Sequence, residues 1–211
     1  MPFGLCNALP TFQQMMNSVY APLIHYCLIV YVDDSNIYSA NFEDHLQDLE
    51  EFFKLTRQNH LRLNSKKCYF GKQKLEFLGF VVSKDGTHAD PKKIEKVNNF
   101  PVPKTPKEAL SFLMLASYYR RFIKGFAKIS APIRILLKKG VPFEWKEPQE
   151  EAFRKLQHCL TSAPILVRPD LQKPFILYTD ASKNGLGAIL AQEGPDKQHH
   201  VIAYTSRATN K

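Results

Sequence analysis

The stretch that decides the fold is CLIVYVDDSNIY, residues 27–38. Its β-branched and aromatic residues flank two adjacent aspartates, a pattern that predicts a β-hairpin with Asp33 and Asp34 at its turn. Carboxylates at a tight turn project beyond the sheet, and such hard oxygen ligands suit Mg²⁺ that is also held by substrate phosphates. The alternative is that the two aspartates only make a polar hairpin turn.

The composition excludes a disordered chain and a membrane-spanning one. Of the 211 residues, 44% are apolar and 12% are aromatic, which is enough to build a core. The longest apolar run, residues 21–32, is well short of the roughly 20 residues that cross a bilayer. The four cysteines form no C-x-x-C pair, so the sequence predicts a reducing compartment, with neither a zinc site nor a disulfide framework.

The net charge of +9 is unevenly distributed along the chain. Residues 1–60 carry a net −5, residues 141–211 carry +1, and residues 61–140 hold 18 Lys and Arg against 5 Asp and Glu. Such a basic block within a foldable region predicts a surface that faces a polyanion, most commonly a phosphate backbone. The alternative is an ordinary solvated lysine face.

The segments around the hairpin predict helices and further strands. Pro10 opens a helix with apolar residues at helical spacing, and Asn41 caps a second helix. Residues 61–63 and 74–82 alternate as strands do, and a turn at residues 84–86 closes them. This order predicts an α+β sheet with helices on one face.

The part after Asp90 is rich in helix signals and prolines. One short helix starts at Pro91, and Thr105, Pro106 and Glu108 combine an N-cap, a proline at the first position and a capping-box glutamate for a helix running to Lys128. At the far end of that helix, tyrosines 118 and 119 stand beside a group of cations, a mixture suited to contact and stacking along a nucleic acid. The alternative is that these tyrosines pack in the core.

The last third predicts a helix followed by strands. Acidic residues after Pro148 favour the start of a helix. Residues 175–180 and 186–192 predict two strands joined by an Asn-Gly turn, and residues 201–204 a third.

Taken in chain order, these segments resemble the reverse transcriptase and early ribonuclease H portion of a Ty3/Gypsy-type retrotransposon polyprotein. The resemblance rests on MPFGLCNA (1–8), YVDD (31–34), LNSKKC (63–68), FLGF (77–80), SYYRRFI (117–123) and YTDAS (178–182). It implies an α+β chain with three parts: a partial reverse transcriptase palm (1–83), a helical thumb and connection (84–144), and the start of an RNase H-like α/β domain (145–211).

The implied function is RNA-directed DNA polymerisation with an associated RNase H, in which two Mg²⁺ ions serve nucleotidyl transfer. The implied partners are an RNA template, a DNA primer, their RNA–DNA hybrid and deoxynucleoside triphosphates, but no membrane. The implied setting is intracellular, in a cytoplasmic particle or the nucleus.

The resemblance also assigns residues. The catalytic metal ligands are Asp33 and Asp34 for polymerisation and Asp180 for RNA cleavage. The other assignments are Phe3, Gly4 and Gln13 around the nucleotide and template, Lys66 and Lys67 near the nucleotide phosphates, Phe77, Leu78, Gly79 and Phe80 as the primer grip, and Tyr119, Arg120, Arg121 and Lys124 at the nucleic-acid backbone.

The sequence departs from the family pattern in ways that bear on activity. The family's first palm carboxylate would lie before Met1, and its further ribonuclease H acids after Lys211. We therefore expect no useful polymerisation from this chain by itself, and an unpaired apolar edge on strand 28–32. The alternative function is that of a non-catalytic nucleic-acid-binding remnant of a decayed retroelement.

Overall fold

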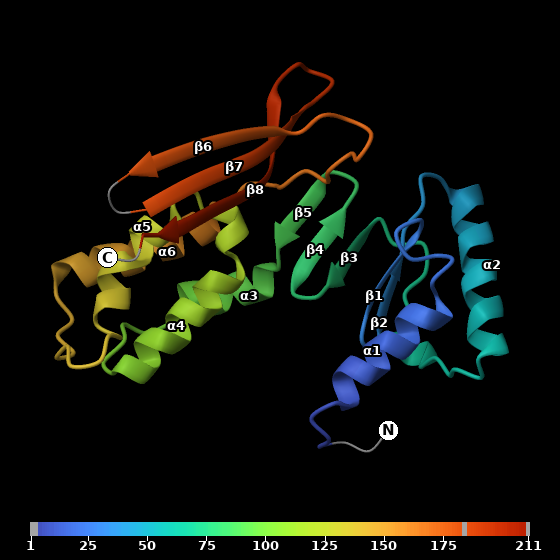
Figure 1. Ribbon diagram of the computed structural model, residues 1–211, viewed down its shortest axis with the longest axis horizontal. Coiled ribbons are helices and arrows are strands. Elements are labelled where there is room, and N and C mark those ends of the chain that lie inside the picture. Colours follow the sequence, from blue (N-terminus) through green and yellow to red (C-terminus); the bar gives the residue numbers. More distant parts are fainter. Residues whose placement is uncertain (1–3, 183–184, 210–211) are drawn as a thin grey trace. The chain divides into compact units, whose positions relative to one another are not determined.

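The computed structural model describes residues 4–182 and 185–209 (Figure 1). The chain divides into two compact units, Met1–Gln73 and Lys74–Lys211, and each is described by itself. The first unit contains α1 (Ala8–Val19), β1 (Leu28–Tyr31), β2 (Asp34–Ile37), α2 (Phe42–Gln58) and the 3₁₀ helix η1 (Ser65–Lys67). The second contains β3 (Lys74–Phe77), β4 (Phe80–Ser83), β5 (Gly86–Ala89), α3 (Pro91–Asn98), α4 (Pro106–Tyr118), η2 (Arg120–Phe122), α5 (Phe126–Ile135), α6 (Glu147–Thr161), β6 (Ile176–Ser182), β7 (Gly185–Glu193) and β8 (His199–Ala208).

The first unit packs two helices against the predicted hairpin. Strands β1 and β2 are antiparallel, and α2 begins at Asn41, whose side chain accepts a hydrogen bond from the Asp44 amide at 2.8 Å. The rings of Tyr20 and Phe52 stack with centroids 4.8 Å apart and join α1 to α2. The buried core of this unit comprises Met16, Tyr20, Leu23, Cys27, Leu28 and Phe52. Both helices and the hairpin therefore form as the sequence predicts.

The free edge of β1 has little to pair with inside this unit. Among the described residues, its pairing beyond β2 is a single parallel bridge between Leu28 and Ile24. The prediction of a strand over residues 61–63 is wrong, because these residues lie in a loop and belong to none of the strands among the described residues. Leu61 turns toward the core, and Leu63 is 45% exposed.

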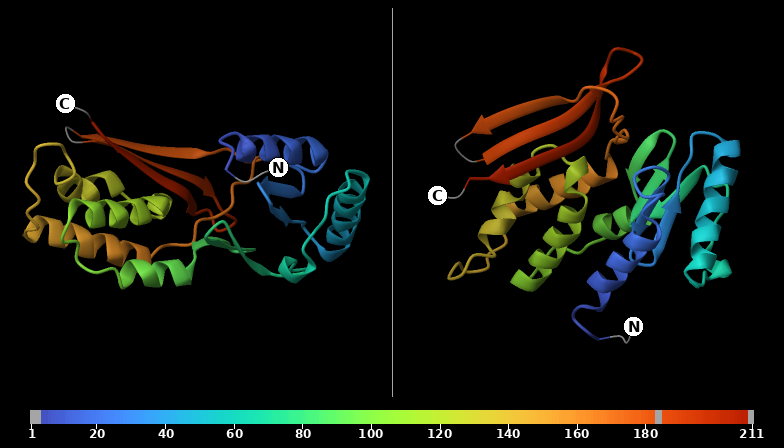
Figure 2. Two further views of the ribbon diagram at one scale, coloured as in Figure 1. Left: turned by 90° about the horizontal axis from the view of Figure 1, so that it is seen from below. Right: turned by 45° about the vertical axis from the view of Figure 1, so that its right-hand side comes forward.

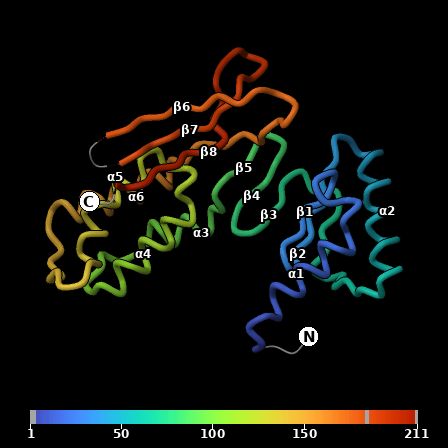
Figure 3. Tube along the Cα trace, in the orientation of Figure 1, coloured from blue at the N-terminus to red at the C-terminus, as the bar shows by residue number. Residues whose placement is uncertain are grey.

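The second unit begins with a three-stranded meander of β3, β4 and β5, which is easiest to follow in the trace of Figure 3. Residues 74–82, whose alternation predicts strand structure, form two strands joined by a tight turn, with Phe77 paired to Phe80. Two backbone hydrogen bonds between Thr87 and Leu166 join the meander to the segment after α6.

The helix predicted from Thr105 to Lys128 is divided in the structure. It starts as expected, with the Thr105 hydroxyl accepting from the Glu108 amide at 3.2 Å, but it ends at Tyr118. A 3₁₀ turn follows, and α5 starts after Gly125, whose φ of 70° lies in the left-handed region that glycine tolerates. The apolar spacing continues to Ile123 through this break, so periodicity alone does not reveal it.

Helices α4, α5 and α6 lie together on one side of the β6–β7–β8 sheet (Figure 2). The strands are antiparallel, as the sequence predicts. Of the predicted Asn-Gly turn, Asn184 lies outside the described residues, and Gly185 is the first residue of β7, where it pairs with Ser182. The buried core gathers mainly from the helices: Val97, Ala109, Phe112, Leu113, Ala116, Tyr119, Phe122, Ile123, Ile133, Ala152, Phe153, Leu156, Leu160 and Leu166.

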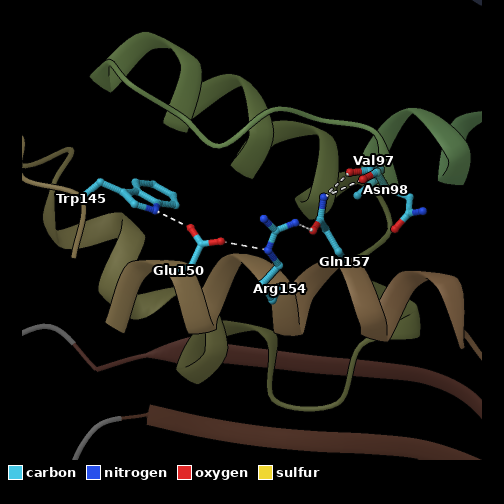
Figure 4. Close-up of polar contacts among 6 residues, drawn as sticks. All are labelled: Val97, Asn98, Trp145, Glu150, Arg154 and Gln157. Atoms are coloured by element: carbon cyan, nitrogen blue, oxygen red, sulfur yellow. Dashed lines mark hydrogen bonds and ion pairs between the residues drawn. The ribbon is translucent and has the colours of Figure 1, made fainter. Parts of the chain in front are cut away.

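A row of polar side chains along α6 fixes the helix to its neighbours (Figure 4). The amide nitrogen of Gln157 donates to the carbonyls of Val97 and Asn98, at 3.0 and 2.9 Å, where α3 ends. About two turns closer to the N-terminus of α6, the Glu150 carboxylate accepts a hydrogen bond from the indole nitrogen of Trp145 at 2.9 Å. The free carbonyls at the end of α3 are thus satisfied by a side chain from another helix.

No helix among the described residues is both long enough and apolar enough to cross a membrane.

Candidate active site

The two aspartates lie at the tip of the β1–β2 hairpin. Tyr31 pairs with Asp34, so the two-residue loop consists of Val32 and Asp33, and Asp34 is the first residue of β2. Both carboxylates are exposed, and within the described part of the chain neither accepts a hydrogen bond or joins an ion pair. Their oxygens are therefore available to a cation or a substrate.

The backbone of this turn is strained at Val32. Its φ is 55°, whereas a two-residue hairpin loop with positive φ normally uses glycine, asparagine or aspartate. A β-branched residue in this region is a genuine outlier, of a kind that costs on the order of 1–3 kcal/mol and persists only where the surroundings impose it.

Gln13 of α1 supplies part of what imposes this conformation. Its side-chain oxygen accepts a hydrogen bond from the Val32 amide at 2.6 Å. Its side-chain nitrogen donates to the Val30 carbonyl at 3.4 Å and to the Asn17 side chain at 2.8 Å. The sequence placed Gln13 around the nucleotide and template, but did not indicate that its amide holds the hairpin itself.

The other residues assigned to nucleotide and template are only partly described. Phe3 lies outside the described residues, and Gly4 is exposed with a φ of 93°. Lys66 and Lys67 lie in η1, where the Asn64 side chain accepts from the Lys66 amide at 3.2 Å, and both lysines are exposed.

The residues assigned to the primer grip form the β3–β4 turn. Phe77 and Phe80 close the loop, and Leu78 and Gly79 have φ values of 48° and 70°. The hydroxyl of Tyr118 donates to the Leu78 carbonyl at 2.5 Å, and that of Tyr119 to the Gly79 carbonyl at 3.0 Å. The sequence did not reveal this contact, which joins residues 40 positions apart.

The residues assigned to the nucleic-acid backbone divide into buried and exposed ones. Tyr119 is 1% exposed, so it packs in the core, as the alternative interpretation of the tyrosines expects, and it does not offer its ring to a ligand. Burial, followed by the negative charge of Asp90, raises the pKa of Tyr119 to about 12. Arg120, Arg121 and Lys124 are exposed just beyond it.

Asp180 lies on β6, where it pairs with Gly187 and is exposed. Across the described parts of the chain, no group of three or more His, Cys, Asp or Glu is placed to hold a metal ion. Asp33 and Asp34 are thus neighbours on one turn, and among the described residues neither they nor Asp180 belong to a group of three such ligands.

Two family models match the chain. Residues 1–82 match the model described as reverse transcriptase (RNA-dependent DNA polymerase), and residues 145–211 match the RNase H-like domain found in reverse transcriptase.

Curated relatives align with the chain almost throughout. The Pol polyprotein of transposon gypsy from Drosophila melanogaster is 42% identical over 206 residues, which cover 92% of this chain and 20% of the polyprotein. The Pol polyprotein of transposon 297 from the same organism is 39% identical over 211 residues, again 20% of its length. The Tf2-3 polyprotein of Schizosaccharomyces pombe is 30% identical, and the chain covers 16% of it. The chain therefore spans about a fifth or less of the length of these relatives.

The fold is also found in solved structures. The foamy viral protease-reverse transcriptase in complex with double-stranded DNA matches with a TM-score of 0.85 at 24% identity, covering all of this chain and 44% of that one. The complex of that protein with an RNA/DNA hybrid gives 0.84 at 24% identity, covering 28% of that chain. At this identity the likeness establishes the fold, a mixed α/β reverse transcriptase arrangement with the start of an RNase H-like domain. Residues 1–82 therefore match the reverse transcriptase family and residues 145–211 the RNase H-like domain found in reverse transcriptases, and Pol polyproteins of gypsy and other retrotransposons align along the length of the chain.

Proposed function

We propose that the chain is the part of an RNA-directed DNA polymerase that carries two of its metal-binding carboxylates, Asp33 and Asp34. The observation that supports this most strongly is the turn itself: a strained two-residue loop presents both carboxylates to solvent without a protein partner among the described residues. Strain of this kind is typical of functional sites, where the surrounding structure maintains it.

The donor set of this turn fits Mg²⁺. Carboxylate oxygens are the hard ligands that Mg²⁺ takes, usually one or two from protein with the remainder from substrate phosphates and water. When bound there, Mg²⁺ would supply activation of the primer 3′ hydroxyl and charge stabilisation of the leaving pyrophosphate. Asp33, in the loop, is proposed as the direct ligand, and Lys66 and Lys67 would bind the nucleotide phosphates by charge.

The 211 residues are proposed to be insufficient for polymerisation when tested as an isolated chain. Their described parts bring no third acidic ligand to Asp33 and Asp34. A two-metal site needs a carboxylate that both ions share, so this ligand would have to come from sequence outside the 211 residues. By the same reasoning Asp180 is proposed as one of several ligands of the RNase H site.

The basic block of residues 61–140 is proposed to bind the nucleic acid. Its net charge of +13 favours contact with phosphates, and the exposed Arg120, Arg121 and Lys124 offer it cations. The related foamy viral enzyme was solved with double-stranded DNA and with an RNA/DNA hybrid, and we propose the same classes of partner here. The three-part division at residues 83 and 144 remains part of this proposal.

A chimera tests the catalytic proposal. The aligned region of the transposon gypsy Pol polyprotein is replaced by these 211 residues, and incorporation of labelled dTTP on poly(rA)·oligo(dT) is measured with Mg²⁺. We expect incorporation by the parent chimera and a loss of at least about 100-fold in Asp33→Asn, the scale at which electrostatic groups at reacting atoms act. The matched control is Asp85→Asn, in the turn before β5, which should leave the rate unchanged.

The alternative, a non-catalytic nucleic-acid-binding remnant, predicts a different result from the same chimera. It predicts salt-dependent binding to the hybrid with no incorporation by the parent, and binding that Asp33→Asn does not alter. Incorporation by the parent chimera that persists in Asp33→Asn would contradict the catalytic role of this turn.

A further inference from the structure

The turn between β3 and β4 is poorly specified by its own two residues. Leu78 and Gly79 both have positive φ, the pattern of a tight hairpin loop for which asparagine or aspartate followed by glycine is preferred. Leucine has no side-chain polar group to stabilise such a conformation, and a bulky residue is rare in it. The loop therefore needs support from outside the hairpin.

Two consecutive tyrosines at the end of α4 give that support. Tyr118 is the last residue of the helix and Tyr119 is its C-cap, so the chain turns between them and their rings lie nearly perpendicular, at 82°. This arrangement lets two neighbouring hydroxyls donate to two neighbouring carbonyls, those of Leu78 and Gly79. Both loop carbonyls thereby accept hydrogen bonds from one tyrosine pair at the end of α4.

The rings fix the turn as well as the hydroxyls. Phe80 stacks on Tyr118 with centroids 5.3 Å apart and meets Tyr119 edge-on at 5.6 Å. A Cβ placed on Gly79 would lie 3.3 Å from two atoms of the Tyr118 side chain. The aromatic contact and the glycine thus fit each other closely.

We infer that Tyr118 and Tyr119 are positioning residues that hold the β3–β4 turn in place for the end of a primer strand. This inference rests on the proposed function and on the resemblance that assigns residues 77–80 to the primer grip. The exposed Arg120, Arg121 and Lys124 follow the tyrosines directly, so the segment proposed to contact the duplex backbone and the turn proposed to hold the primer end are joined by two hydrogen bonds. In this proposal the tyrosines act through the turn, and the buried Tyr119 offers no ring surface to the nucleic acid.

The test removes the hydroxyls and keeps the rings. Tyr118→Phe, Tyr119→Phe and the double variant are made in the chimera, and Tyr204→Phe is the control. Tyr204 packs against the same core, and its hydroxyl has no hydrogen-bond partner within the described residues. Hydrogen exchange of the peptide spanning residues 77–81 reports on the turn, and dissociation from a recessed DNA primer on an RNA template, compared with a blunt hybrid, reports on primer holding.

We expect each single substitution to speed both exchange and dissociation from the recessed primer by about fivefold, the factor that one net hydrogen bond supplies. The tyrosine variants should dissociate from the blunt hybrid at the parent's rate. The Tyr204→Phe variant should keep the parent's rates of both exchange and dissociation. Unchanged exchange in the double variant, or equal effects on recessed and blunt substrates, would overturn the inference. A parent chimera that binds but incorporates no nucleotide contradicts the proposed polymerase function. Hydrogen exchange and dissociation are both measured without catalysis, so they still test the role of the tyrosines in that case.

Discussion

At the scale of single residues, the turn that carries Asp33 depends on a residue that is not acidic. Val32 is held in a left-handed conformation, and its amide donates a hydrogen bond to the side-chain oxygen of Gln13. The side-chain nitrogen of Gln13 donates to the Val30 carbonyl. A small displacement of groups that hold reacting atoms costs much of the rate, so under the proposed function we expect Gln13 to affect catalysis through the turn.

Substitution of Gln13 tests this dependence. In the chimera, Gln13→Ala should lower kcat for dTTP incorporation by about tenfold or more, because the hydrogen bonds that hold the turn are lost. Binding of the primer–template should stay the same. Gln14→Ala is the matched control, since Gln14 is its exposed neighbour on α1. A change in KM with an unaltered kcat would instead place Gln13 at the substrate.

Cys27 provides a second prediction at this scale. It is buried beside the hairpin, and burial, with a hydrogen bond and charge from Asp48, raises the pKa of its thiol from 9.0 to about 11. Since the thiolate is the reactive form, alkylation by iodoacetamide at pH 8 should be at least about tenfold slower at Cys27 than at the exposed Cys6. Mass spectrometry of the two peptides makes the comparison, and equal rates would mean that the first unit is open in solution.

The raised pKa also fixes the sign of a pH dependence. Between pH 9 and about 11 the unfolded thiol has lost its proton while the folded one keeps it, so the free energy of unfolding should fall as pH rises through this range. Denaturant titrations of the parent and of Cys27→Ala measure this decrease. It should be smaller in Cys27→Ala, which lacks the thiol.

The sequence predicted the aspartates better than their support. Two adjacent carboxylates between β-branched runs are a local pattern, and Asp33 and Asp34 are found at the tip of the expected hairpin. The contacts of Gln13 with Val32, and of Tyr118 with Leu78, join residues 19 and 40 positions apart, and such contacts leave no local signal. The sequence also did not predict which of the two adjacent tyrosines is buried: Tyr118 is 51% exposed and Tyr119 is 1% exposed.

At the scale of elements, the helices were predictable from their caps and the strands less so. Asn41 and Thr105 each accept a hydrogen bond from a backbone amide in the first turn of their helix, as the sequence predicts, and Asp90 does the same for α3. The hairpin within residues 74–82 was not predicted from alternation, because a Leu-Gly loop lacks the residues that usually signal a tight turn.

Helix α6 depends on one buried amide. Gln157 is 5% exposed and satisfies the carbonyls of Val97 and Asn98. Gln157→Leu should therefore lower the free energy of unfolding of the second unit by about 1–3 kcal/mol, because these carbonyls lose their donor. Urea unfolding measures the change, with the exposed Lys155→Leu on the same helix as control. Equal stability of the two variants would show that water replaces the amide.

At the scale of the whole chain, charge is the feature that the proposed function uses. Residues 61–140 carry a net +13 against −5 in residues 1–60, so binding to a nucleic acid should be dominated by phosphate contacts. The affinity of the chimera for an RNA–DNA hybrid should fall steeply with salt. Arg120→Ala and Lys124→Ala should each reduce the slope of log K against log salt by about 1.

The control for this salt series is Lys155→Ala, an exposed lysine outside the basic block. If it changes the slope as much as Arg120→Ala does, binding is a property of overall charge, and the basic block has no special role.

The most direct test of the central claim is a crystal structure of the chimera with an RNA–DNA primer–template, a non-hydrolysable deoxynucleoside triphosphate analogue and Mn²⁺ in place of Mg²⁺. We predict anomalous peaks next to the carboxylate oxygens of Asp33 and Asp34, at distances near the roughly 2.1 Å typical of such ligands, with the remaining protein carboxylate supplied from outside these 211 residues. Mn²⁺ bound to the nucleotide without either aspartate would contradict the account.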